Sequence, residues 1–120
     1  MSRAPAKRVV HLELHTAELA QARAYYRRLL GWHAEQVGHG HGCYAALALG
    51  DDLSGGIVQC DTVRALWLPY VDVPDIGRAT ADARALGASV LLAPREGPAG
   101  WRSVLRTSYG GELAFWQAKH

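Results

Sequence analysis

Apolar and polar residues alternate strictly along the segment VVHLELHT, residues 9–16. A strand with this period of two places its apolar and its ionisable residues on opposite faces. The apolar set is Val10, Leu12 and Leu14, and the ionisable set is His11, Glu13 and His15. We expect the apolar set to pack against a helix and the ionisable set to face away from it.

A helical pattern follows this strand. Leu19, Ala22, Tyr26 and Leu29 are spaced by three, four and three residues, which gives one apolar stripe on a helix. Thr16 is the expected N-cap, and Gly31 is the expected stop at the C-terminal end.

The same pattern returns 57 residues later, where Ile76 takes the place of Leu19. Ile76, Ala79, Ala83 and Leu86 form the second stripe, Gly87 ends it, and LWLPYVDV precedes it as VVHLELHT precedes the first. Strand-like segments follow each helix: WHAEQV, CYAALAL and GGIVQ in the first half, and SVLLA, WRSVLRT and GGELAFWQ in the second. The chain is therefore predicted to be an α+β protein of two βαβββ modules, residues 7–60 and 64–118.

One module alone would bury too little apolar surface to be stable. We therefore expect residues 1–120 to form a single domain in which the two modules share a curved mixed sheet. The helices would cover its outer face, and the ionisable row of the first strand would face the concave side.

The segments VVHLEL, AQARAYYRRLLGW, WLPYVDVPDIGRATADARALGASVLLAP and GGELAFWQ resemble the vicinal oxygen chelate superfamily, in particular its small glyoxalase/bleomycin-resistance-like members. The resemblance covers nearly the whole chain. It implies the glyoxalase/bleomycin resistance fold, a cytoplasmic homodimer, and chemistry that ranges in this superfamily from glyoxalase and dioxygenase reactions to drug binding without chemistry.

Metal-dependent members bring four ligands to the concave face, one from the first and one from the last strand of each module. His11 matches the first of these positions, whereas its counterpart in the second module is Leu68. The last-strand positions are expected near Gln59 or Cys60 in the first module and at Phe115 in the second. The resemblance thus leaves His11 as the one expected metal ligand. We expect either no cofactor or a divalent metal held by an altered ligand set.

Strand geometry limits what the ionisable row can do. His11 and His15 are four residues apart, or ~13 Å along a strand at ~3.3 Å per residue, so a regular strand cannot bring both to one ion. The segment GHGHGC, residues 38–43, is expected to be a glycine-rich hairpin loop rather than a metal site. Cys43 and Cys60 are expected to be small buried hydrophobes with free thiols.

Strand parity predicts a second set of candidates in the second module. Tyr70, Phe115 and Leu68 are expected to share the concave face, where aromatic walls suit a bulky organic ligand. His15 is expected near the end of its strand as a further ligand contact. Arg102 and Arg106 are candidate cations whose facing the sequence leaves open.

Composition limits the classes of partner that this protein is expected to bind. A net charge of +2 and the absence of a basic cluster interleaved with aromatic residues argue against nucleic acid. No apolar run approaches the length of a membrane span, and the two cysteines fit a cytoplasmic protein better than a disulfide scaffold.

Two functions stay open. The first is a protein that binds a small organic molecule in the concave cleft without the usual metal site. The second is an enzyme, a lyase, isomerase or dioxygenase, that uses an altered metal site or uses His11 and Glu13 as acid and base.

Overall fold

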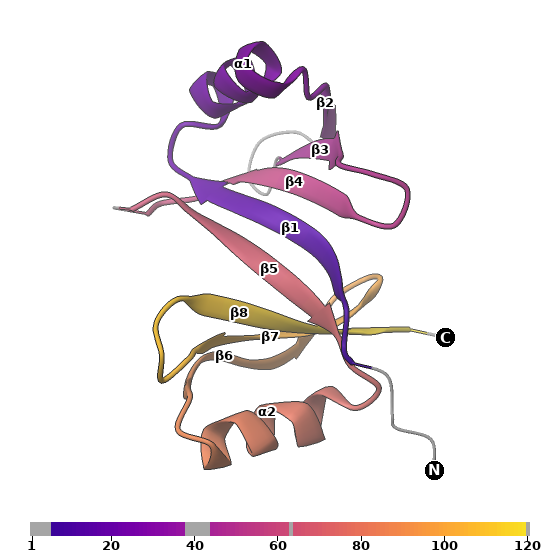
Figure 1. The fold of residues 1–120 in the computed structure, drawn as a ribbon, viewed down its shortest axis with the longest axis vertical. Helices are drawn as coiled ribbons and strands as arrows, with labels where there is room; N and C mark the ends of the chain where they lie inside the picture. Colours follow the sequence, from indigo (N-terminus) through magenta and orange to yellow (C-terminus); the bar gives the residue numbers. More distant parts are fainter. Residues whose placement is uncertain (1–5, 38–43, 63, 120) are drawn as a thin grey trace. The chain divides into compact units, whose positions relative to one another are not determined.

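The computed structural model describes residues 6–37, 44–62 and 64–119. A strand, a helix and three further strands follow one another twice along the chain, so the predicted α+β repeat of two βαβββ modules is confirmed (Figure 1). The elements are β1 (Val9–Thr16), α1 (Leu19–Leu30), β2 (Ala34–Val37), β3 (Tyr44–Ala48), β4 (Ser54–Gln59), β5 (Leu66–Asp72), α2 (Ile76–Ala85), β6 (Ser89–Glu96), β7 (Gly100–Arg106) and β8 (Glu112–Ala118).

Two compact units divide the chain. We call Val10–Leu68 the N-terminal unit, and Met1–Val9 together with Pro69–His120 the C-terminal unit. The boundary falls within β1 and β5, close to the module boundaries expected from the sequence.

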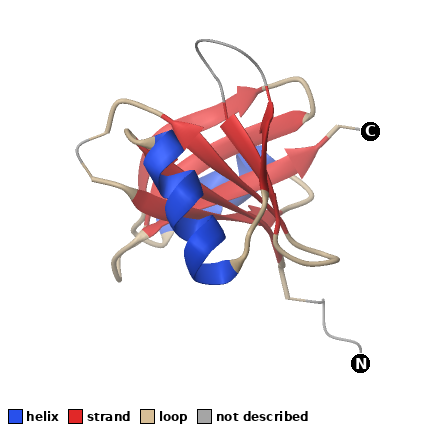
Figure 2. Cartoon of the chain, turned by 90° about the horizontal axis from the view of Figure 1, so that it is seen from above, coloured by secondary structure: helices blue, strands red, loops and turns tan. Residues whose placement is uncertain are grey.

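Strands of the N-terminal unit are hydrogen-bonded in the order β2-β3-β4-β1. β1 and β4 are parallel, with His11 opposite Ser54 and Glu13 opposite Gly56, and the other neighbours are antiparallel. The core lies between this sheet and α1, the helix in front in Figure 2. Its buried members are Leu14, Leu19, Ala45, Leu47 and Ile57. Leu14 therefore faces the helix, as the alternation in β1 predicts.

The start of α1 differs from the expectation. Glu18, not Thr16, is the N-cap residue, and its side chain makes no capping hydrogen bond. Instead the Leu19 N–H donates to Oε1 of Gln59 at 2.9 Å, and the Gln59 amide donates to the Ala17 carbonyl. Gln59, at the end of β4, thus accepts the hydrogen bond that a local N-cap residue was expected to accept. At the other end, Gly31 has φ 73° and donates to the Arg27 carbonyl, which confirms the predicted stop.

In both helices, the last residue of the predicted apolar stripe is exposed rather than buried. Leu29 is 58% exposed and Leu86 is 84% exposed, because each lies in the final turn of its helix or just beyond it. Leu19 and Ile76, at the opposite ends, are buried. Helical spacing identifies the buried face correctly but does not show where the sheet beneath it ends.

Strands of the C-terminal unit are hydrogen-bonded in the order β5-β8-β7-β6. α2 begins at the N-cap Asp75, whose carboxylate accepts from the Arg78 N–H at 3.1 Å. Ile76 N–H donates to Oε1 of Gln117 at 2.8 Å. Beneath the helix, the hydroxyls of Thr80 and Ser103 lie 2.9 Å apart, and both side chains are buried.

β6 pairs with β7 through two register shifts, one between Val90 and Leu92 and one between Leu92 and Arg95. After the second shift, Arg95 lies opposite Arg102. Within the described part of the chain, no helix has the length and apolar character needed to cross a membrane.

Candidate functional site

Glu13 joins the two histidines of β1 into one hydrogen-bonded row. Nε2 of His11 lies 3.1 Å from one Glu13 carboxylate oxygen, and Nε2 of His15 lies 2.8 Å from the other. All three side chains are on the face of β1 opposite Leu14, as the alternation predicts. His11 and His15 each keep 25% of their side-chain surface exposed and Glu13 keeps 16%, so a ligand can reach the row. We call His11, Glu13 and His15 the polar row.

Ser54 extends the row onto β4. Its hydroxyl oxygen lies 2.7 Å from Nδ1 of His11 and 3.3 Å from the Val10 carbonyl. With Glu13 ionised, its oxygens can only accept, so both histidines present an N–H at Nε2. A neutral His11 then accepts the Ser54 proton at Nδ1. A charged His11 donates to Ser54 instead, and the Ser54 hydroxyl turns to the Val10 carbonyl.

Small residues form the surface beside the polar row. Strand pairing places Gly56 opposite Glu13, Ala46 opposite Gly56 and Glu35 opposite Ala46. Between the two glutamates, this line of the sheet therefore carries only a glycine and an alanine. The Tyr44 ring lies at the edge of this surface, 3.5 Å from where a Cβ on Gly56 would be. The face thus combines a carboxylate with two imidazoles, an open surface and one aromatic ring, a combination that suits a small organic ligand.

The residues of this chain do not fit the metal site expected from the superfamily. No group of three or more His, Cys, Asp or Glu side chains arranged to hold a metal occurs in residues 6–37, 44–62 and 64–119. In the polar row, both imidazoles are turned to the Glu13 carboxylate rather than to a common point. On β4, the neighbours of the row are Ser54 and Gly56, neither of which supplies a carboxylate.

Two of the expected last-strand positions face the helices instead. Gln59 is bonded to the start of α1. Phe115 lies opposite Ser103, whose hydroxyl meets Thr80 of α2, so Phe115 is on the helix side of its sheet. The expectation that Phe115 shares a face with Tyr70 is therefore wrong. The parallel pairing of β5 with β8 sets Tyr70 opposite Ala114, which puts Trp116 on the face of Tyr70.

Tyr70 keeps the predicted facing and has a cationic neighbour. It is 5% exposed, and Nη1 of Arg102 donates to its hydroxyl oxygen at 3.2 Å. Leu68, two residues earlier on β5, is buried and shares the strand face of Tyr70. Arg106 lies on the same face as Arg102 and is 4.0 Å from Glu112. The facing of both arginines is thus resolved.

Of the two cysteines, Cys60 lies within the described residues. Cys60 is a free, half-buried thiol just after β4. Burial raises its pKa, and the nearby Asp61 and Glu13 carboxylates act in the same direction, against a hydrogen bond with the backbone of Thr16 that lowers it. It therefore stays protonated at neutral pH and is a poor nucleophile. Cys43 and the GHGHGC segment lie outside the described residues.

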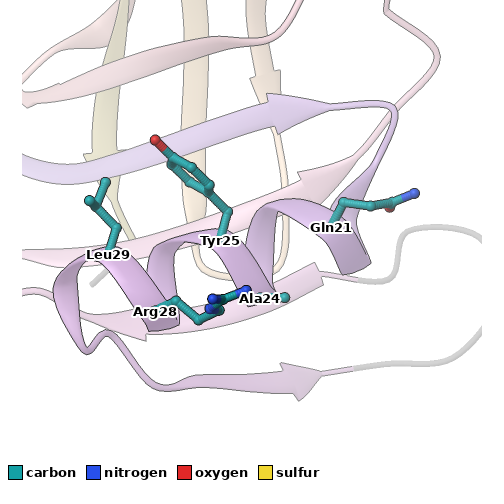
Figure 3. Close-up of a pocket in the computed structure, with 5 residues that line it drawn as sticks. All are labelled: Gln21, Ala24, Tyr25, Arg28 and Leu29. Carbon is teal, nitrogen blue, oxygen red and sulfur yellow. The ribbon is translucent and has the colours of Figure 1, made fainter.

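A hollow of about 620 Å³ lies against the exposed side of α1. It is lined by Gln21, Ala24, Tyr25, Arg28 and Leu29, with Tyr25 and Leu29 projecting from the same side of the helix (Figure 3). All five residues come from one helix, and the polar row is not among them. The hollow is a feature of the helix surface, separate from the polar row.

Comparison with solved structures identifies the fold. The chain superposes on a hypothetical protein from Bacillus halodurans with a TM-score of 0.72 and 11% identity, over 97% of each chain. It superposes on methylmalonyl-CoA epimerase of Streptomyces coelicolor, in complex with 2-nitronate-propionyl-CoA, with a TM-score of 0.66 and 16% identity, over 92% of this chain and 94% of that one. The epimerase from Mycobacterium tuberculosis gives 0.65 and 15%, over 93% and 88%.

The chain has the vicinal oxygen chelate fold. The resemblance in the strand, helix and glycine patterns is thereby confirmed at the level of architecture. Neither a protein-family model nor a curated protein sequence matches the chain. The fold alone does not show what this chain does.

Several residues on the sheet faces that carry the polar row and Tyr70 were not predicted from the sequence. The Ser54 contact depends on the pairing of β4 with β1, whose residues are about forty positions apart, and the place of Tyr44 depends on the pairing of β4 with β3. The aromatic side chain beside Arg102 is Trp116 rather than Phe115, a difference of one residue in register. The Gly55–Gly56 pair was a visible signal for an open surface, because glycine within a strand often marks a site where another molecule approaches closely.

Proposed function

We propose that this protein binds a small organic molecule on the sheet face of the N-terminal unit, with the polar row as the anchoring group. The observation that carries the proposal is the Glu13 carboxylate, held between two imidazoles beside an open surface of Gly56 and Ala46. Residues that only stabilise a strand do not require this arrangement. The solved structures of the same fold that contain CoA esters support a ligand-binding role.

The chemistry of the surface defines the ligand class. Glu13 accepts hydrogen bonds, His15 and His11 bring N–H groups to the same carboxylate, and Tyr44 offers the edge and face of an aromatic ring. A planar or bulky organic molecule with a hydroxyl, amine or amide donor matches these groups. The donor would share the Glu13 oxygens with the imidazoles, and the apolar part would lie over Gly56 and Ala46.

Gly56→Ala is the variant that tests this proposal most directly. A Cβ at Gly56 meets the Tyr44 ring and the Ala45 carbonyl at 3.5 Å, which is ordinary contact, so the protein should fold. The new methyl group occupies the surface beside Glu13. Gly50→Ala is the matched control, because a Cβ there meets nothing within 4 Å and lies in the connection between β3 and β4.

The measurement is a thermal-shift screen of planar and bulky compounds that carry hydroxyl, amine or amide groups, followed by calorimetry of the hits. A compound at 100 times its Kd should stabilise the protein by about 2.7 kcal/mol. We expect Gly56→Ala and Glu13→Ala to weaken binding at least tenfold, about 1.4 kcal/mol, and Gly50→Ala to leave it unchanged. Hits that bind all four proteins equally would place the binding site elsewhere.

A second candidate function is proton transfer, as in an isomerase or epimerase. The observation that favours it is the continuous chain from Ser54 through His11 and Glu13 to His15, which can accept a proton at one end and release it at the other. Exchange of a carbon-bound hydrogen of the bound ligand with D2O would distinguish the two functions. Exchange that disappears in Glu13→Gln while binding persists indicates an enzyme, and absence of exchange in the unmodified protein indicates a binding protein.

The metal-dependent alternative is tested by elemental analysis of protein purified without a His-tag. The donor set described above does not favour a metal site. Near-stoichiometric metal that disappears in His11→Ala would show that the chain builds a metal site from His11 together with other residues.

A further inference from the structure

Two arginines lie side by side on the face of the C-terminal unit that carries Tyr70. Arg95 of β6 is directly opposite Arg102 of β7, and residues paired in this way share a face with their Cβ atoms ~5 Å apart. Like charges directly opposite each other destabilise a sheet. Arg102 also lies opposite Trp116 of β8. The three side chains therefore form one line across three strands.

Arg102 is oriented by a neutral group. Its Nη1 donates to the Tyr70 hydroxyl at 3.2 Å, and no ion pair within 4.0 Å involves Arg102 among the described residues. Every buried side-chain nitrogen and oxygen of the described residues has a hydrogen-bond partner. The other Arg102 donors are therefore accessible to solvent rather than buried and unsatisfied, so they can reach an external acceptor.

Trp116 forms the aromatic side of the same surface. Its six-membered ring passes over Gly100, where a Cβ would come within 2.8 Å of Trp116 Cζ2. Gly100, Arg102 and Trp116 share the face by strand parity and pairing. A planar aromatic wall beside a guanidinium excludes water on one side, and this strengthens a hydrogen bond to a charged acceptor.

The acidic groups of this face do not neutralise the arginine pair. Glu112 lies 4.0 Å from Arg106, which is four residues along β7 from Arg102. Asp72 is paired with Trp116, so Trp116 stands on the strand between Asp72 and Arg102. Within the C-terminal unit, the pair therefore keeps a net positive charge, with Arg95 exposed and Arg102 half-buried.

We propose that Arg95 and Arg102 form an oxyanion-binding site that takes a phosphate or a carboxylate group, with Tyr70 orienting Arg102 and Trp116 walling one side. Planar guanidinium groups match the paired oxygens of such anions, and an anion between the two arginines removes their repulsion. This site is in the C-terminal unit and shares no residue with the polar row.

The test uses the full chain with inorganic phosphate and, separately, acetate, each titrated against chloride at equal ionic strength. Arginine Nε–H signals in nitrogen-edited NMR report binding at each guanidinium. We expect saturable shifts at Arg95 and Arg102, and none at Arg78, an exposed arginine of α2. A larger effect of phosphate than of acetate identifies phosphate as the preferred group, and the reverse identifies carboxylate.

Variants separate a built site from general attraction to positive charge. Arg102→Gln should raise the apparent Kd at least tenfold, since it removes a charge-assisted hydrogen bond to the anion. Arg95→Gln should raise it severalfold, and the matched control Arg78→Gln should leave it within twofold. Equal shifts at all arginines, no shift at any, or unchanged affinity in Arg102→Gln would overturn the proposal.

A charge reversal provides a test that does not depend on loss of folding. Arg95→Glu creates an opposite-charge pair with Arg102, so the melting temperature in chloride should rise while the response to phosphate disappears. A lower melting temperature with an unchanged phosphate response would show that the two guanidinium groups do not act together.

Discussion

Gln59 and Gln117 occupy equivalent places in the two modules and make the same hydrogen bond. Each stands at or near the end of the last strand of its module, and each accepts the first backbone N–H of the module's helix through Oε1, from Leu19 at 2.9 Å and from Ile76 at 2.8 Å. The first helical N–H groups have no partner within the helix. Each helix is thereby tied to the strand farthest from it along the module, which fixes the helix start over the sheet.

Replacing either glutamine should loosen one module. Gln59→Ala removes the acceptor for Leu19 and a donor to the Ala17 carbonyl, so we expect a loss of about 0.5–1.5 kcal/mol of unfolding free energy. Gln117→Ala should cost a similar amount. Urea denaturation measures both, and Gln21→Ala on the exposed side of α1 is the control that should change stability little. Equal effects of all three variants would mean that the strand-to-helix bonds contribute nothing specific.

Two glycines in strands should differ in how much stability is lost when each is replaced by alanine. Gly100→Ala brings a Cβ to 2.8 Å from the Trp116 ring and into the Gln117 carbonyl, so overpacking should cost about 1–3 kcal/mol. Gly56→Ala makes only ordinary contacts, at 3.5 Å and beyond, and should change stability by less than about 0.5 kcal/mol. Thermal denaturation of the pair compares them directly. If Gly100→Ala is the milder variant, the Trp116 ring does not lie over Gly100.

The buried hydroxyl pair beneath α2 gives a double-mutant prediction. The hydroxyls of Thr80 and Ser103 are hydrogen-bonded to each other at 2.9 Å, and the Thr80 hydroxyl donates to the Ile76 carbonyl at 2.6 Å. Because Thr80 has a single hydroxyl proton, it accepts the hydrogen bond from Ser103. Thr80→Val leaves the Ser103 hydroxyl unsatisfied and should cost about 1–3 kcal/mol. Adding Ser103→Ala should recover part of that loss, because both polar groups are then gone. Additive losses in the cycle would show that the two hydroxyls are not coupled.

Alkylation should reveal the protonated state of Cys60. Its pKa is raised by burial, so in a Cys43→Ser background iodoacetamide should modify it more slowly at pH 7 than it modifies a free thiol. The rate should rise as the pH passes above the ordinary thiol range. A raised native pKa also means that this group's contribution to stability is complete below the unfolded pKa and is lost as the pH rises through the native one. Rapid modification at pH 7 would contradict the buried environment.

Local periodicity was sufficient for most of the architecture. The alternation of His11, Glu13 and His15 and the repeated helical spacing depend only on neighbours along the chain, and both patterns reappear in the structure. The predictions for Thr16, Leu29 and Leu86 were wrong because they depend on residues distant in the sequence. Gln59, at the end of β4, takes the capping role expected of Thr16. Leu29 and Leu86 are exposed because the sheet does not extend beneath the last turn of either helix. Helical and strand periods contain no information about those positions.

The candidate site was predictable in part. The polar row follows from one strand, but its bridging carboxylate geometry and the Ser54 contact need the pairing of β1 with β4. Phe115 was placed on the wrong face because one residue of register in β8 exchanges it with Trp116, and a parallel strand pair formed across more than forty residues gives no local sign of its register. The exchange changes the aromatic neighbour of Arg102 but leaves the composition of the strand unchanged.

The two register shifts in β6 have a consequence for charge. Had the pairing of Val90 with Leu105 continued without interruption, Arg95 would lie opposite Gly100; the shifts move it to Arg102. Two positions on an antiparallel strand correspond to ~7 Å at ~3.4 Å per residue, enough to change two adjacent cations into two separated ones. The electrostatic potential of this face is therefore set by the backbone path between Val90 and Arg95 as much as by the arginines themselves. Deleting two of the residues between Val90 and Arg95 would remove both shifts, and the regular ladder from Val90 onward would still bring Arg95 opposite Arg102.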